Sequence, residues 1–196
     1  FTFVGATSYN AVKGQAGTEI RQSQNTNVNI IQLNPKRIED LALRRAILAS
    51  VDREQIAKAY FSQLGWTEPL PGSIIAMPFQ KGYQNNYAGD TGAQAAGKIL
   101  EAAGYSKSGN YYAKIGKVAG FALTSFGSEA VYQAVYQILE QQLKSAGIRL
   151  SADNQPQSNS NSVLGQKSYE AIFTGWGVLP DLASSAPYFF TTEVFG

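Results

Sequence analysis

The 196-residue sequence contains neither cysteine nor histidine. Thiol nucleophiles, Ser-His triads and zinc sites with their usual ligands are therefore excluded, and so is the only side chain that titrates unaided near neutral pH. Most classes of enzyme need at least one of these groups, so we expect no enzyme, no bound metal and no cofactor. The lack of cysteine does not identify a compartment, because cytosolic proteins and many exported bacterial proteins share it.

Charge is also scarce. Only 15% of the residues are charged, and 16 Lys and Arg against 14 Asp and Glu leave a formal charge of +2. No basic stripe interleaved with aromatic residues occurs, so nucleic acid is not an expected partner. The apolar runs are broken within a few positions, far short of the roughly 20 residues that span a bilayer. We expect no membrane span in this chain.

The opening residues, FTFVGATSYN (1–10), show no basic region followed by an apolar one, as a signal peptide would. We therefore expect a protein that was never exported, a mature form or a cut piece. At 44% hydrophobic and 12% aromatic residues, the composition is that of a folded protein. The length predicts one compact domain with its own core.

The first half of the chain predicts a strand and two helices. Near-alternating apolar residues indicate a strand at Asn27–Asn34. A helix is expected after Pro35, and a second one begins at Asp52, a predicted N-cap with Gln55 in capping-box position, and ends at Gly65. The apolar positions that carry the helical spacing are Leu41, Leu43, Ile47, Leu48 and Val51, then Ile56, Ala57, Tyr60, Phe61 and Leu64.

The second half alternates helices with short strands. Helices are expected from Thr91 to Gly104 and from Ser128, a predicted N-cap, to Gly147. The polar stretch Ser151–Ser162 is interpreted as a connection. Strands are expected at VAGFALTS (118–125), IRL (148–150) and AIF (171–173). This succession predicts an α/β domain with at least one crossover unit.

Two segments lie outside these elements. The Pro- and Gly-rich stretch of residues 65–90 is too long for a simple connector, and long ordered loops are usually functional or cover a neighbouring surface. Phe1–Val4 is compatible with an edge strand. Four tyrosines in polar segments could line a cleft, but are more simply packing covers: Tyr83, Tyr87, Tyr111 and Tyr112.

Trp176 stands between Gly175 and Gly177, where the last apolar run ends. The two glycines and Pro180 are expected to end the strand. A tryptophan at the carboxyl end of a strand lies where open α/β sheets place their ligands, on a backbone that can bend close to one. The alternative is a tryptophan that only plugs the edge of the sheet.

Four blocks of the sequence, in this order, resemble one family. They are LALRRAILASVDREQIAKAYF (41–61), AGKILEAAGY (96–105), VYQILEQQLKSAGIRL (135–150) and YEAIFTGWG (169–177). The blocks are similar to those of the family 5 extracellular solute-binding proteins of ABC importers, which include the dipeptide- and oligopeptide-binding proteins. They extend from about Asn27 to Gly177.

The resemblance implies a mixed sheet flanked by helices, forming one lobe of a two-lobed, type II periplasmic-binding-protein-like fold. Residues 1–196 would be the carboxyl-terminal lobe, with 1–26 and 183–196 leading towards a missing lobe, so we expect the two chain ends to lie close together. It implies an extracytoplasmic monomer, in the periplasm or anchored as a lipoprotein, which delivers a small solute to an importer permease. Di- and oligopeptides are the expected cargo, with a sugar or a metal complex as the alternative.

The resemblance also implies a binding role for Gly175, Trp176 and Gly177. In peptide-binding members an Asp after the Trp holds the peptide's amino terminus. Here Leu179 occupies the third position after Trp176. The nearest carboxylate is Asp181, which either takes that role through a shifted turn or caps its own turn.

Three more residues are candidates at a strand-to-helix step. Thr124, Ser125 and Ser128 lie where free N–H groups attract anions, although ordinary capping by Ser128 explains them more simply. Asp52 and Arg53 could form an exposed acid-base pair, but the role of Asp52 as a cap accounts for them without a ligand.

Two other functions stay open. A glycosidase would use two carboxylates. An interaction domain would use the Ser- and Asn-rich surface. The acidic residues available to a glycosidase share no motif: Glu129, Glu140, Asp153, Glu170 and Asp181.

Overall fold

The fold was analysed in a computed structural model. It describes residues 6–21, 25–61, 64–65, 67–87, 89–127, 130–179 and 184. The expected edge strand at Phe1–Val4, the cap Ser128, the Asp181 turn and nearly all of 183–196 lie outside these residues. The expected closeness of the two chain ends falls outside them as well.

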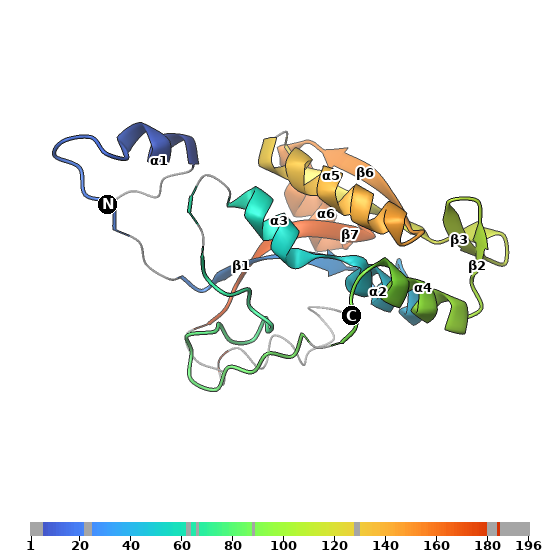
Figure 1. Cartoon of the computed structure of the whole chain (residues 1–196). Helices are drawn as coiled ribbons and strands as arrows, with labels where there is room; N and C mark the ends of the chain where they lie inside the picture. Colours follow the sequence, from blue (N-terminus) through green and yellow to red (C-terminus); the bar gives the residue numbers. More distant parts are fainter. Residues whose placement is uncertain are drawn as a thin grey trace.

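The central feature is a four-stranded mixed sheet in the order β1-β7-β5-β6 (Figure 1). Its strands are β1 (Asn27–Leu33), β5 (Gly120–Phe126), β6 (Arg149–Gln155) and β7 (Ala171–Gly177). Strands β6 and β7 both run parallel to β5, whereas β1 pairs antiparallel with β7 along its whole length. The predicted α/β class and crossover unit are therefore confirmed.

Helices cover both faces of this sheet. The crossovers β5-α5-β6 and β6-α6-β7 run in opposite directions along it, so two right-handed connections place their helices on opposite faces. Figure 1 shows α5 in front of the strands and α6 behind them. The helices are α1 (Ala6–Val12), α2 (Leu41–Ser50), α3 (Arg53–Tyr60), α4 (Ala93–Ala102), α5 (Ala130–Ser145) and α6 (Ser160–Gln166), and a 3-10 turn spans Gln157–Asn159.

The core lies between the sheet and the helices α2, α4 and α5. Its fully buried apolar side chains come from the positions that have helical spacing in α2, α4 and α5 and from the inner face of the strands. They include Ile47, Leu100, Val135, Leu139, Leu143, Ile148 and, on β7, Ala171. Burial of this apolar surface is the main stabilising contribution to the lobe.

The predicted helices are present, with shifted boundaries. Helix α2 begins at Leu41 rather than just after Pro35, because the side chain of Asp40 accepts hydrogen bonds from the backbone N–H groups of Ala42 and Leu43. Helix α4 has Gly92 as its N-cap, without a side-chain cap, so the expected cap at Thr91 is wrong. Helix α3 ends at Tyr60, before Gly65.

Three other expectations are corrected. Ser151–Ser162 is no plain connection, because β6 extends through it to Gln155 and α6 follows. Strand β7 does not end at Phe173 but continues through Gly175 and Trp176 to Gly177, paired with β1 at every position.

The third correction concerns a small antiparallel sheet that the sequence did not predict, β2-β3-β4 (Ser106–Ser108, Tyr111–Lys114, Lys117–Val118), which lies beyond α4 in Figure 1. It contains Tyr111 and Tyr112, which were expected in polar loops. Tyr112 is buried there, and its hydroxyl donates a hydrogen bond to Glu101.

Candidate functional site

The candidate site is the sheet edge where the parallel strands β5, β6 and β7 end. This edge carries Phe126, Gln155 and Gly177, the last residues of the three strands. Carboxyl ends of parallel strands are where open α/β sheets bind ligands. Trp176 is the second-last residue of β7 and pairs with Val28 of β1, so it lies at this edge but within the strand.

Strand alternation fixes the face on which Trp176 lies. Phe173 packs on the face of the sheet that α5 covers. Its ring centroid lies 5.5 Å from that of Tyr132 in α5 and 6.2 Å from that of Tyr60 in α3. Successive side chains of a strand point to opposite faces, so Trp176, three residues further on, lies on the face away from α5. Its side chain is half-buried, as expected for a residue at the rim of a lobe. A ligand contact of Trp176 stays a prediction.

The glycines flanking Trp176 leave room beside the backbone. Gly175 is exposed, and a Cβ atom added there would meet none of the described residues within 4 Å. Gly177 is exposed too, with Asn27 Oδ1 at 3.6 Å from such a Cβ. The end of β7 therefore presents backbone rather than side chains, which permits close approach of another molecule. The binding roles of Gly175 and Gly177 also stay predictions.

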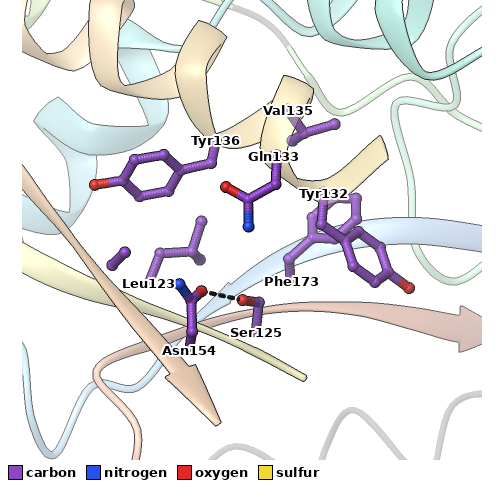
Figure 2. A pocket seen from close by; sticks show the side chains of 9 residues that line it. Leu123, Ser125, Tyr132, Gln133, Val135, Tyr136, Asn154 and Phe173 are labelled. Atoms are coloured by element: carbon purple, nitrogen blue, oxygen red, sulfur yellow. Dashed lines mark hydrogen bonds between the residues drawn. The ribbon is translucent and has the colours of Figure 1, made fainter. Parts of the chain in front are cut away.

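Thr124 and Ser125 lie inside β5, within the strand expected at 118–125, and not at the N-terminus of α5. Thr124 is 0% exposed, and its hydroxyl donates to Asp153 Oδ2 over 2.7 Å. Ser125 donates from Oγ to Asn154 Oδ1 over 2.8 Å, across to β6 (Figure 2). Both hydroxyls thus join neighbouring strands, and a role in solute binding is not needed to explain them.

A small cavity lies between α5 and the sheet, next to Ser125. Figure 2 shows Tyr132, Gln133 and Tyr136 on the α5 side of the cavity, with the Gln133 amide between the two tyrosine rings and above Ser125 and Asn154. Its volume is about 50 Å³, whereas one water molecule takes up about 30 Å³ in the liquid. Burial, and then the negative charge of Glu140, raise the pKa of Tyr136, so this phenol stays neutral. The cavity is therefore too small for a peptide, since pockets that bind small molecules measure roughly 300–1,000 Å³.

A second, shallow hollow of about 290 Å³ lies at the other end of β6. Among its lining residues are Lys144 on α5, Tyr111 on β3 and Leu150 near the start of β6. It is therefore far along the strand from the carboxyl edge, and neither hollow contains Trp176. A site at Trp176 would therefore lie outside both of these hollows.

The predicted cap at Asp52 is confirmed. Its Oδ1 accepts a hydrogen bond from Gln55 N over 3.1 Å at the start of α3. The reciprocal partner of a capping box is supplied from α5 rather than by Gln55. Gln142 accepts from Asp52 N over 3.0 Å and donates to Gln55 Oε1 over 2.7 Å. The expected cap Ser128 and the expected anchor Asp181 lie outside the described residues.

Of the acidic residues considered for a glycosidase, Glu170 and Asp153 have structural partners. Glu170 accepts from Ala122 N over 2.6 Å and so joins the start of β7 to β5. Asp153 accepts from Thr124 and from Gln155 Nε2, each over 2.7 Å. Glu140 is an exposed position of α5.

Sequence reasoning missed one residue beside the candidate site. Gln80, in the long loop, donates from Nε2 to the carbonyl oxygen of Leu179 over 3.1 Å. Leu179 is the third residue after Trp176. No local pattern marks such a contact, because it joins residues 99 positions apart; only the length of the loop hinted that it covers a neighbouring surface.

Within the described part of the chain, no three acidic residues gather as metal ligands would. Its helices are also too short or too polar to cross a bilayer.

Comparison with known proteins assigns the fold. The family model of the bacterial extracellular solute-binding proteins, family 5 (middle part), matches residues 1–195. No curated protein sequence matches the chain. Solved structures do, at 20–21% identity, and they show the type II periplasmic-binding-protein fold.

Three such structures illustrate the likeness. The oligopeptide-binding protein AppA from Bacillus subtilis, in complex with a nonapeptide, has 20% identity and a TM-score of 0.73, covering 90% of this chain and 36% of its own. NikZ from Campylobacter jejuni, in complex with Ni(L-His), has 20% identity and a TM-score of 0.67, covering 92% and 36%. The periplasmic EDTA-binding protein EppA has 21% identity and a TM-score of 0.79, covering 97% and 37%. The chain thus spans little more than a third of the length of these proteins.

Proposed function

We propose, because the chain belongs to the family 5 bacterial extracellular solute-binding proteins, that it forms one of two lobes which enclose a solute for an ABC importer. The observation that carries the proposal is the end of β7, where a half-buried Trp176 stands between two exposed glycines at the carboxyl edge of the sheet. Such an edge offers an aromatic ring, and backbone that no neighbouring side chain covers at the two glycines, to a ligand. The family is one of binding proteins rather than enzymes, so no chemical step is assigned.

The mechanism follows from the proposal that a second lobe supplies the other wall of the binding site. A solute that contacts Trp176 on this lobe and other groups on a second lobe stabilises the closed arrangement by its extra affinity for that state. A permease that recognises only the closed state then receives loaded protein. This mechanism places the protein outside the cytoplasm, on the side from which an importer takes up its cargo.

For the cargo we propose peptides, with Asp181 as the candidate anchor of the peptide's amino terminus. The support is twofold: AppA was solved with a nonapeptide, and Asp181 is the carboxylate nearest to Trp176 along the following chain. Metal complexes are the competing cargo, because NikZ was solved with Ni(L-His). Sugars are the third class to test.

The test is solute binding by the full-length protein that carries this chain, measured by isothermal titration calorimetry. The probes are a mixture of tri- to nonapeptides, the nickel–histidine complex, Fe(III)-EDTA and maltose. We expect the peptides to bind and Trp176→Ala to weaken binding at least tenfold, equivalent to about 1.4 kcal/mol. Asp181→Asn should weaken peptide binding selectively if this carboxylate holds the amino terminus.

A matched control is Ile115→Ala, which removes a side chain that is 98% exposed at the tip of the β3-β4 hairpin. It should bind as the unsubstituted protein does. Unchanged affinity of a folded Trp176→Ala variant for the bound probe would contradict the proposed site. Binding of nickel–histidine or maltose in place of peptides would contradict the cargo class alone.

A further inference from the structure

The long loop that follows α3 is folded on itself. Gly72 N donates to the hydroxyl oxygen of Tyr83 over 2.8 Å, and Asn86 N donates to Gly72 O over 2.9 Å. Gly72 lies so close to Asn85 that an added Cβ would stand 1.8 Å from Asn85 Oδ1 and 3.1 Å from its Cα. This close approach requires glycine. Residues 71–87, called here the 71–87 loop, therefore have a defined internal arrangement.

Arg53 ties the base of this loop to the helices. Its Nη1 donates to Pro71 O over 2.7 Å, and its guanidinium carbon lies 3.5 Å from the ring centroid of Tyr87. The hydroxyl of Tyr87 donates in turn to Leu48 O at the end of α2 over 3.1 Å. Arg53 follows the cap Asp52, so one side chain at the start of α3 holds both ends of the 71–87 loop. This explains Arg53 without an exposed acid-base pair.

The other side of the loop contacts the chain that leaves Trp176. Gln80 accepts from Met77 N over 2.6 Å and donates to Leu179 O over 3.1 Å. Val178, between Trp176 and Leu179, is 3% exposed, and its N–H donates to Thr26 O over 2.7 Å. The chain after Trp176 is therefore held from both sides, by the residue before β1 and by Gln80. Figure 1 shows the loop running beside the segment that leaves β7.

We propose that Gln80 is a positioning residue for solute binding: it fixes Leu179, and through it the turn after Trp176, relative to the rest of the lobe. This inference rests on the proposed function. Leu179 lies beyond the last paired residue of β7, so the sheet alone does not place its carbonyl group. A binding site loses affinity when its supporting groups leave it free to shift by about 1 Å. The Arg53 contacts with Pro71 and Tyr87 hold the ends of the 71–87 loop, from which Gln80 extends.

Gln80→Glu separates the hydrogen bond that Gln80 accepts from Met77 N from the one that it donates to Leu179 O. The carboxylate still accepts from Met77 N, but it has no proton to donate to Leu179 O at neutral pH. The matched control is Gln84→Glu, which makes the same change in charge at an exposed position of the same loop. Both variants are made in the full-length protein and compared with the unsubstituted protein.

Three measurements are needed. Calorimetry at pH 7 measures affinity for the peptide mixture, for nickel–histidine, for Fe(III)-EDTA and for maltose. Hydrogen–deuterium exchange reports on the fragment that spans residues 177–182, and urea unfolding reports on global stability. We expect Gln80→Glu to bind at least fivefold more weakly than the unsubstituted protein and to exchange faster in that fragment. Its urea unfolding midpoint should equal that of Gln84→Glu.

A pH series adds a readout that a purely structural role would not move. A free Glu side chain has a pKa of about 4.3. Glu introduced against a carbonyl oxygen should regain a proton, and the hydrogen bond, as the pH falls towards 4. The ratio of affinities between Gln80→Glu and Gln84→Glu should then approach one.

The outcomes separate this inference from the proposed function. Equal affinity of both variants for a probe that the unsubstituted protein binds would overturn the role of Gln80 alone. Slower or unchanged exchange at 177–182 in Gln80→Glu would also overturn it. An unsubstituted protein that binds none of the four probes contradicts the proposed function itself, and the positioning role in binding falls with it.

Discussion

Replacing Asn34 should destabilise the lobe more than any exposed polar substitution, because this side chain joins the end of β1 to the start of β7. Asn34 is only 6% exposed. Its Nδ2 donates to Lys167 O over 2.9 Å and to Tyr169 O over 3.0 Å, and its Oδ1 accepts from Lys36 N over 3.0 Å. The same residue's backbone N–H donates to Glu170 O and remains in any variant.

The size of the effect follows from these three side-chain hydrogen bonds. Each contributes about 1 kcal/mol net, and removing one partner leaves the other group unsatisfied, so Asn34→Ala should lower the free energy of unfolding by about 3 kcal/mol. Asn34→Asp should cost at least as much. It keeps the acceptor for Lys36 N but turns a carboxylate oxygen towards two carbonyl oxygens.

The assay is urea unfolding of the 196-residue chain followed by far-ultraviolet circular dichroism. Asn29→Ala is the control, because Asn29 is the same residue type, in the strand that Asn34 directly follows, but is exposed; it should change stability by no more than about 0.5 kcal/mol. A cost for Asn34→Ala below about 1 kcal/mol would refute this reasoning, because the three bonds would then contribute little. A milder effect of Asn34→Asp than of Asn34→Ala would show that the donor role of Nδ2 does not matter.

Three further predictions test the local structure. Asp52→Ala should lower the free energy of unfolding by about 1 kcal/mol, the usual cost of losing an N-cap, in the same urea assay; no measurable change would contradict the cap. Gly147→Ala should lower the melting temperature clearly, because φ is +74° there and the added Cβ would lie 2.7 Å from Tyr112 Cδ2; a left-handed non-glycine residue costs about 1–2 kcal/mol before any clash. For Asp40, burial raises the pKa, but hydrogen bonds from Lys114, from Tyr105 and from two backbone N–H groups outweigh it, so the pKa is lowered overall. The contribution of Asp40 to stability is present above the ordinary carboxyl pKa and is lost as the pH falls through the lowered pKa. Asp40→Asn should therefore reduce the fall in the free energy of unfolding below about pH 4. An unchanged fall would contradict a stabilising role for these hydrogen bonds.

The elements that the sequence predicted best are those specified by their own residues. The strand β1 and the helices α2 to α5 have apolar residues at the right period, and a glycine in the left-handed conformation follows α4 at Gly104 and α5 at Gly147. Asp52 was found because its capping bond reaches only three residues ahead. Asp40 carries the same signal, an Asp directly before an apolar helical run, and could have been found in the same way.

The elements that were missed are specified by distant partners. The last five of the seven residues of β6 are SADNQ, a polar sequence with no strand character, yet they pair with β5 as far as Gln155. Its strand conformation comes from that pairing at the edge of the sheet, where exposed polar side chains carry no cost. In the same way Gly175 and Gly177 predict a break, but pairing with β1 keeps β7 extended through both.

The residues of the candidate site also differ in whether the sequence alone reveals them. Trp176 and its glycines stand out in the sequence, since a large ring between two glycines is unusual at the end of a strand. The burial of Thr124 and the contact of Gln80 with Leu179 do not, because both depend on side chains brought together from other strands and loops.

The position of Trp176 is set at both ends of β7. At the start of the strand, Asn34 ties β7 to β1 and Glu170 ties it to β5, and a slip of β7 by one residue would turn Trp176 to the face that α5 covers. At its end, Val178 is buried and bonded to Thr26, and Leu179 is bonded to Gln80. Two glycines in a strand each cost about 0.5–1 kcal/mol, and neither fills space inside the lobe. A ring that only plugged the sheet edge would need no open backbone on either side, so this costly pair of glycines favours a surface built to meet another molecule.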